Sequence, residues 1–153
     1  KDTIYLADNI KNNEGISRVC LIAHECRHSV QSKLLQKLNF IFSNINIIYF
    51  IIISVLTILK VITNQSLQIA ILMLFTLIEF SVRSFLEIDA MTKAKYLAKE
   101  YMEKTKLCTE EEKNKLLKEY ENINKIGIPF VIDNLLTTAL ARVLIYCIVS
   151  IIW

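Results

Sequence analysis

The sequence predicts an all-α, mainly helical integral membrane protein. Hydrophobic residues make up 54% of the 153 residues, and the mean hydropathy of +0.41 is too high for an ordinary soluble domain. Charged residues nevertheless account for 22% of the chain, which is too many for membrane spans alone. Apolar and charged residues must therefore lie in separate segments, and we expect a single membrane-embedded domain over residues 1–153 that combines both.

Residues 1–38 are predicted to form a short strand and a helix. Thr3–Leu6 alternates between polar and apolar residues, which is typical of one strand, and a strand is not stable alone. It would either lie at an edge and pair with an extended peptide or merely cover the helix. Because the chain begins at Lys1 and shows no secretory signal peptide, we interpret it as a fragment or a processed form.

Residues 39–83 are predicted to form a transmembrane helical hairpin. Asn39–Leu59 carries no formal charge over about twenty residues, the length that a helix needs to cross the hydrocarbon of a bilayer. Ile69–Phe80 is apolar but shorter and could be a buried core helix, yet its position after a first span and a polar turn favours the return arm. Glu79, with Arg83 at the next turn, is typical of an ion-paired acid inside the membrane.

Residues 84–125 are predicted to contain a helix that supplies an acidic metal ligand, followed by a charged helical hairpin. Lys93–Lys125 is dense in Lys and Glu and has a helical pattern. Thr109–Glu112 has the form of a capping box, which marks the start of a helix, and Gly127 with Pro129 predicts a helix end. We expect this hairpin to be solvated and to pack beside the site.

Residues 126–153 are predicted to form a C-terminal transmembrane helix. Asp133 and Arg142 interrupt this apolar stretch, which ends on Trp153, a residue common at membrane interfaces. A charged side chain is costly in lipid, so we expect Arg142 to face protein or water.

The chain has only two histidines, and they lie in one motif. His24–His28 reads HECRH, so the imidazoles are four residues apart and a glutamate follows the first. On a helix, this HExxH pattern turns two imidazoles toward one zinc ion and places the carboxylate beside its water. Chance placement of two histidines would produce it in about 0.1% of chains of this length. We therefore predict a zincin-like helix with His24 and His28 as ligands of Zn²⁺ and Glu25 as the catalytic base.

A catalytic zinc needs a third protein ligand, and the candidates are Glu79, Glu87 and Asp89. Glu87 is favoured because a hairpin returns the chain to the face that it left, near the HExxH helix. Glu79 lies deeper in the apolar segment, and Asp89 lies on nearly the opposite helix face, where it would support a ligand or pack a helix. Cys20 shares a face with His24, but three successive turns of one helix do not converge on one ion.

Charge and cysteine usage predict where the catalytic face lies. Apart from Lys60 and Arg142, all Lys and Arg residues lie on the side of the HExxH helix and the charged hairpin, which favours the cytoplasmic side. The four cysteines form no CxxC pair and Cys147 lies in a span, so we expect free thiols in a reducing compartment. The net charge of +3 does not indicate nucleic acid, whereas lysines near the spans would meet anionic headgroups.

Two motifs and the hairpin between them resemble a known family. HECRHSVQ at His24–Gln31 and the sequence EIDA at Glu87–Ala90, followed by Ala94, are similar to the neutral zinc metallopeptidases of the YugP-like membrane family. That family pairs a HExxHAxQ-type helix with a downstream E-x-D/N-A-S motif after hydrophobic segments. The likeness covers most of the chain and implies a gluzincin-like peptidase in a bacterial cell membrane.

The resemblance also implies roles for single residues. His24 and His28 match the family's metal-binding histidines, and Glu87 matches its third ligand. Glu25 matches the catalytic carboxylate, and Asp89 matches the acidic or amide position of the second motif.

The chain departs from the family pattern at three positions. Arg27 stands where the family usually has Gly, Ser29 where it has Ala, and Met91 where it has Ser. Arg27 would either enter the cleft, where it could bind a substrate carboxylate or crowd the metal, or point away as a solvated residue. Gln31 could reach the cleft or contact backbone, but we expect it to pack the helix.

The predicted function is that of a zinc-dependent membrane endopeptidase. A zinc-activated water and the Glu25 carboxylate as general base would hydrolyse peptide bonds of peptides or proteins near the lipid bilayer. The alternative is a non-catalytic zinc-binding membrane protein with a degenerate peptidase site. A helical membrane protein without any metal is a third hypothesis.

Overall fold

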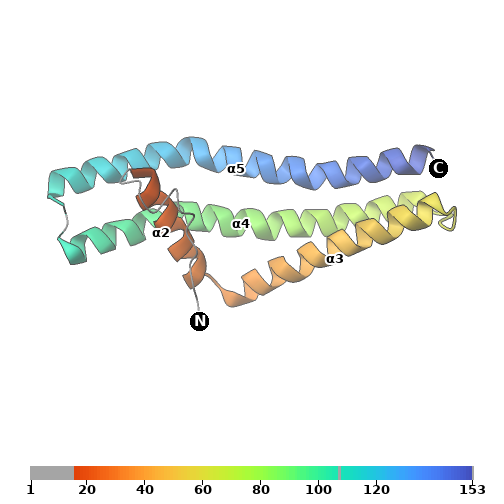
Figure 1. Cartoon of the computed structure of the whole chain (residues 1–153), viewed down its shortest axis with the longest axis horizontal. Coiled ribbons are helices and arrows are strands. Elements are labelled where there is room, and N and C mark those ends of the chain that lie inside the picture. Colours follow the sequence, from red (N-terminus) through yellow and green to blue (C-terminus); the bar gives the residue numbers. More distant parts are fainter. Residues whose placement is uncertain (1–15, 107, 153) are drawn as a thin grey trace. The chain divides into compact units, whose positions relative to one another are not determined.

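The computed structural model describes residues 16–106 and 108–152, and every regular element in them is an α-helix (Figure 1). This confirms the all-α prediction for that part of the chain, whereas the strand expected at Thr3–Leu6 lies outside it. The helices are α2 (Ile16–Val30), α3 (Lys33–Ile58), α4 (Gln65–Thr105) and α5 (Glu110–Ile152).

The helices are grouped into two compact units, and the long helices α4 and α5 contribute to both. The first unit comprises Lys1–Ser32 and Leu86–Phe130, and the second comprises Lys33–Phe85 and Val131–Trp153. The HExxH motif and Glu87 therefore belong to the first unit. Each unit has its own core and its own polar contacts.

Three helices are long and apolar enough to cross a membrane, as a membrane protein requires. The most apolar stretches of α3, α4 and α5 have mean hydropathies of 2.2, 1.9 and 2.2. No more than 28% of any of these stretches is buried, so most of their apolar side chains face outward. An outward apolar surface of this extent is unusual for a protein in water and is what a lipid environment accommodates.

The helix boundaries differ from the predicted segments in two places. α3 begins at Lys33 rather than Asn39, so its first turns precede the uncharged run. The second span, the helix with Glu87 and the first arm of the charged hairpin are one continuous helix, α4. These differences arise because a helix continues wherever the backbone hydrogen bonds continue, whether its side chains are apolar or charged.

The predicted helix end at Gly127 and Pro129 is wrong, because α5 runs through both residues without a break. Proline inside a helix removes one hydrogen bond, and the bonds of the flanking residues keep the helix intact. Gly127 has a packing role instead. A Cβ atom added at Gly127 would lie 2.8 Å from Cε of Met91 on α4, so the missing side chain leaves room for the end of the Met91 side chain.

The second unit has an apolar core at one level of its helices and a polar network at another. Ile53, Leu72, Val143 and Tyr146 form the apolar cluster. In the polar network, Glu79 accepts hydrogen bonds from Ser43 and Asn46 and pairs with Arg142, whose Nη1 is 2.6 Å from Glu79 Oε2.

This network corrects one expectation and confirms another. The partner of Glu79 is Arg142 on α5, whereas Arg83, one turn away on the same helix, is exposed. The prediction that Arg142 faces protein is confirmed. Sequence proximity favoured Arg83, but packing of α4 against α5 within the second unit brings Arg142 to the carboxylate.

In the first unit, small side chains allow α2 to pack closely against α4 and α5. Ala23, Ala94, Ala98 and Tyr120 form its buried cluster, with Cys20 at the margin. The Tyr120 hydroxyl donates to the backbone carbonyl of Cys20 at 3.2 Å, which ties α5 to α2.

The capping box at the start of α5 is confirmed. The backbone N–H of Glu112 donates to Oγ1 of Thr109 at 3.3 Å, and the backbone N–H of Thr109 donates to the Glu112 carboxylate at 2.8 Å. Two backbone donors that the helix start leaves unpaired are thereby satisfied.

Candidate metal centre

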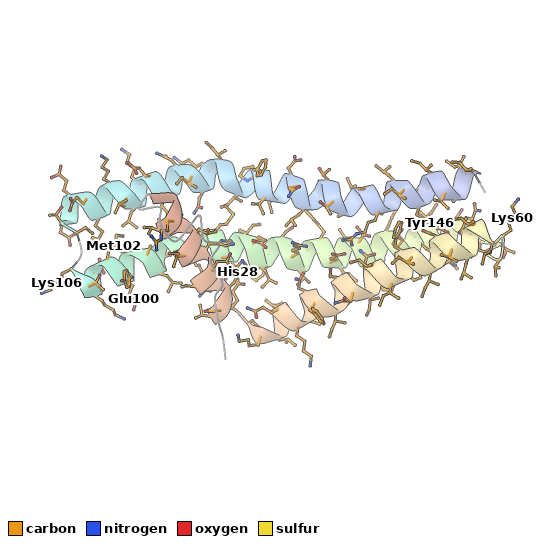
Figure 2. All side chains as sticks on the ribbon, in the orientation of Figure 1. His28, Lys60, Glu100, Met102, Lys106 and Tyr146 are labelled. Carbon is orange, nitrogen blue, oxygen red and sulfur yellow. The ribbon has the colours of Figure 1, made fainter. Side chains whose placement is uncertain are left out.

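The two histidines of the motif and Glu87 converge on one point. His24 and His28 lie one turn apart on α2, on which Figure 2 labels His28, and Glu87 lies on α4. Nε2 of His24 and Nε2 of His28 are 3.0 Å apart. Oε2 of Glu87 lies 3.5 Å from the first nitrogen and 3.6 Å from the second.

These distances can be tested against zinc coordination. Three atoms with these separations lie on a circle with a radius of about 2.0 Å, and protein zinc ligands bind at about 2.0–2.2 Å. The three donor atoms are therefore spaced so that one zinc ion could contact all of them at normal bond lengths. Two imidazole nitrogens and one carboxylate oxygen also match a zinc donor set that leaves a fourth position open.

The three side chains are accessible from solvent. His24, His28 and Glu87 are 20%, 26% and 25% exposed, which leaves an ion and a water molecule a path to the group. Among the described residues, His24, His28 and Glu87 are the only group of His, Cys, Asp or Glu side chains with the geometry to share a metal ion.

Electrostatics at the centre favour a positive charge between the carboxylate and the imidazoles. The hydrogen bond to Glu87 raises the pKa of His28, and the charge of Glu25 adds to this increase. Hydrogen bonds from His24 and then from His28 lower the pKa of Glu87. Without metal, the Glu87 carboxylate therefore favours a proton on His28, and a divalent cation would take the place of that positive charge.

Asp89 does not join the ligand group, and it accepts hydrogen bonds from three other side chains. Nε and Nη2 of Arg27 lie 3.2 and 3.1 Å from its Oδ2, Nε2 of Gln31 lies 3.0 Å from the same atom, and Nζ of Lys93 lies 2.5 Å from Oδ1. Burial alone raises the pKa of Asp89, but these hydrogen bonds outweigh it and lower the pKa. The carboxylate is therefore held in its charged form.

The contacts of Asp89 settle the open question about Arg27. Its guanidinium group neither enters the metal centre nor lies free in solvent, because its Nε and Nη2 both donate to Asp89 on α4. Arg27 therefore joins α2 to α4 next to the centre.

The Gln31 side chain makes more specific contacts than the sequence predicts. Its side chain is buried, with 6% exposure, and its Oε1 lies 2.8 Å from Nδ1 of His28. We expected Gln31 mainly to pack the helix. The available signal was its position one turn after the second histidine, where its side chain reaches the far side of the imidazole ring.

Glu25 directly follows the candidate metal ligand His24 in the sequence. The side chain is half-buried, and among residues 16–106 and 108–152 no hydrogen bond or ion pair engages its carboxylate. Such a carboxylate can accept a proton from a water molecule in the centre.

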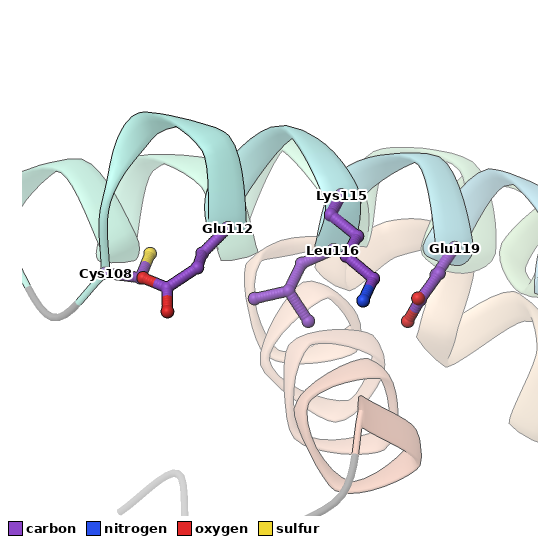
Figure 3. A pocket seen from close by; sticks show the side chains of 5 residues that line it. All are labelled: Cys108, Glu112, Lys115, Leu116 and Glu119. Carbon is purple, nitrogen blue, oxygen red and sulfur yellow. The ribbon is translucent and has the colours of Figure 1, made fainter.

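The other candidates for the third ligand lie elsewhere. Glu79 belongs to the second unit and forms an ion pair with Arg142. The Cys20 thiol is not part of the ligand group, and burial raises its pKa. A recess at the start of α5, lined by Glu112, Lys115, Leu116 and Glu119 of that helix and by Cys108 before it, contains none of the ligand residues (Figure 3).

No protein-family model matches the sequence, and no curated protein or solved structure matches it. The contribution of this centre to function must therefore be argued from its own donor atoms, their spacing and the residues that hold them.

Proposed function

We propose that the chain is a zinc-dependent membrane endopeptidase of the kind found in the YugP-like metallopeptidase family. One observation carries the proposal: Glu87, 59 residues after His28, meets both imidazoles at distances that suit one zinc ion, and Glu25 follows the first histidine. A structural zinc site needs no glutamate beside the first histidine, whereas hydrolysis by HExxH enzymes does.

The residues of the metal centre and Glu25 would have different roles in the reaction. His24, His28 and Glu87 bind the metal, and their exposed side leaves room for a peptide carbonyl. When bound, zinc polarises that carbonyl and makes water acidic near neutral pH. The Glu25 carboxylate accepts the proton of the attacking water and then delivers it to the nitrogen of the leaving amine.

The substrates we propose are peptides or proteins close to the bilayer, cleaved on the cytoplasmic side of a bacterial cell membrane. α2 ends at Val30 and the apolar helix α3 begins at Lys33, so only two residues separate the motif helix from a possible span. The Lys residues of α4 and α5 in the first unit support this side, because positive charge is retained on the cytoplasmic face.

A Glu25→Gln variant tests the proposal. The amide keeps the size of the side chain but does not accept a proton, so kcat/KM toward a peptide library should fall by about 10²–10⁴-fold. Zinc content, measured on the same purified sample in detergent, should remain that of the unchanged protein. Glu100→Gln, an exposed position on α4, serves as the matched control and should retain full cleavage.

Two results would contradict the proposal in different ways. Undiminished cleavage by Glu25→Gln with normal zinc content would remove the catalytic role of this carboxylate. Stoichiometric zinc without any cleavage by the unchanged protein would favour the non-catalytic zinc-binding alternative.

A further inference from the structure

The orientation of the Gln31 amide is determined by its three neighbours. Its Nε2 lies 2.7 Å from the backbone carbonyl of Leu86 and 3.0 Å from Oδ2 of Asp89. Both neighbours are acceptors only, so the NH₂ group must face them. The carbonyl Oε1 is therefore directed toward Nδ1 of His28, and the reversed amide would place oxygen against oxygen at two contacts.

This orientation determines which nitrogen of His28 carries the proton. Oε1 of Gln31 only accepts, so Nδ1 of a neutral His28 must be the N–H that donates to it. The lone pair is then on Nε2, the atom that faces His24 and Glu87. Only this tautomer presents a donor atom to a metal ion at that point.

The same amide also holds the segment that carries Glu87. Leu86 directly precedes Glu87 and Asp89 follows two residues later, so Gln31 binds α4 on both sides of the carboxylate ligand. Asp89 is in turn held by Arg27 and Lys93.

We propose that Gln31 is a positioning residue of the metal centre, one that selects the Nδ1–H tautomer of His28 and fixes α4 so that Glu87 meets the imidazoles. Its amide accepts a hydrogen bond from the imidazole and donates one to the Asp89 carboxylate. In many zinc proteins a carboxylate contacts the histidine directly instead. The effect on metal affinity rests on the proposed function, whereas the effect on the tautomer does not.

Two measurements on the full-length chain test this role. The first is zinc affinity, determined by competition with a chelator. The second is the tautomer of His28 in the metal-free protein at alkaline pH, read from long-range proton–nitrogen spectra, which two histidines make simple to assign.

Gln31→Met keeps the length of the side chain and removes all three hydrogen bonds. We expect zinc to bind about 10–100-fold more weakly, the usual effect of losing an outer partner of a ligand. We also expect His28 to lose its uniform Nδ1–H state. Gln31→Glu keeps an acceptor for Nδ1 and should retain that state. Gln68→Met, the same change at a residue that accepts from Tyr49 in the second unit, should leave both measurements unchanged.

The outcomes distinguish this inference from the proposed function. If Gln31→Met binds zinc as tightly as the unchanged protein and keeps the Nδ1–H tautomer, the inference is overturned while the metal centre stands. An Nε2–H tautomer in the unchanged metal-free protein overturns it without any variant. If the unchanged protein binds no zinc, the proposed function fails, and the tautomer measurement still decides whether Gln31 orients His28.

Discussion

Arg27 and Asp89 show how single residues can support a metal centre without contacting the metal. Arg27 directly precedes His28, and Asp89 lies two residues after Glu87, so their ion pair connects the two ligand-bearing helices beside the ligands themselves. With side chains only 22% and 10% exposed, the pair is shielded from solvent and should be worth more than a surface ion pair.

Arg27→Ala should therefore destabilise the protein. Hydrogen bonds to charged groups contribute about 1.5–3 kcal/mol, and Asp89 would lose two of its donors, so we expect a loss of roughly that size in the free energy of unfolding. Denaturant titration in detergent measures it. Arg83→Ala, an exposed arginine on α4, is the control and should change the free energy by less than about 0.5 kcal/mol. Equal effects of the two variants would contradict the assigned role.

The pairing of His28 with Glu87 predicts a pH dependence in the metal-free protein. Folding lowers the pKa of Glu87, so this carboxylate stabilises the fold at pH values above its ordinary pKa of 4.5. The contribution disappears as the pH falls through the lowered pKa. Folding raises the pKa of His28, so this imidazole stabilises the fold at pH values below its ordinary pKa of 6.5. The contribution disappears as the pH rises through the raised pKa. Both contributions are complete between pH 4.5 and 6.5.

The stability difference between the unchanged metal-free protein and Glu87→Gln should therefore be largest in that window. Unfolding titrations at about pH 5.5 and pH 9 compare the two proteins. The difference should shrink at the higher pH because the imidazole has lost its proton. A difference independent of pH would show that the carboxylate and the imidazoles do not interact in solution.

At the scale of elements, the continuity of α4 and α5 decides what each helix can do. α4 carries Glu79 in the second unit and Glu87 in the first, so one helix serves both a polar network and the metal centre. α5 passes through Gly127 and Pro129 and likewise contributes to both units. In the first unit, α4 and α5 approach each other where the end of the Met91 side chain lies against Gly127 and where Asn124 donates to the backbone carbonyl of Met91 at 2.8 Å.

Gly127→Leu should disturb this approach. Its side chain would begin at the Cβ position, 2.8 Å from Met91 Cε, and overpacking of this kind costs about 1–3 kcal/mol. Shortening the neighbour by Met91→Ala should relieve the clash, so the two changes together should cost less than their sum in a double-mutant cycle. Strict additivity of the unfolding free energies would mean that the helices are not in contact there.

At the scale of the whole molecule, helices apolar enough to cross a membrane must neutralise the charges that they contain. Glu79 is 8% exposed and Arg142 is 20% exposed, and Ser43 and Asn46 supply the further donors to the carboxylate. The network joins all three helices of the second unit. It explains how two ionisable residues are accommodated in otherwise apolar helices.

Arg142→Leu should leave the Glu79 carboxylate buried without its counter-charge. Removing one partner of a buried ion pair typically costs about 3–5 kcal/mol, so we expect a loss of that order in detergent unfolding. Replacing both partners, with Glu79→Gln and Arg142→Leu together, should recover part of it because no charge then remains buried. If Arg142→Leu alone were as stable as the unchanged protein, the pairing would be wrong.

Features that depend on neighbouring residues can be predicted from the sequence. Apolar runs of sufficient length indicated helices that could cross a membrane, the Thr109–Glu112 pattern located a helix start, and HExxH spacing placed two imidazoles on one helix face. Each depends on local periodicity and hydrophobicity. The strand at Thr3–Leu6, the peptidase activity and the single-domain organisation stay predictions.

Tertiary structure alone decided which distant side chains meet. Glu79, Glu87 and Asp89 are all chemically suitable acids, of which the sequence favours Glu87, and packing of α4 against α2 brings Glu87 and not the other two to the imidazoles. The same packing directs Arg27 to Asp89 and the Gln31 amide to His28. These partners are separated by up to 63 residues, as His24 and Glu87 are, or are selected by a third group on another helix, so local sequence rules carry no information about their contacts.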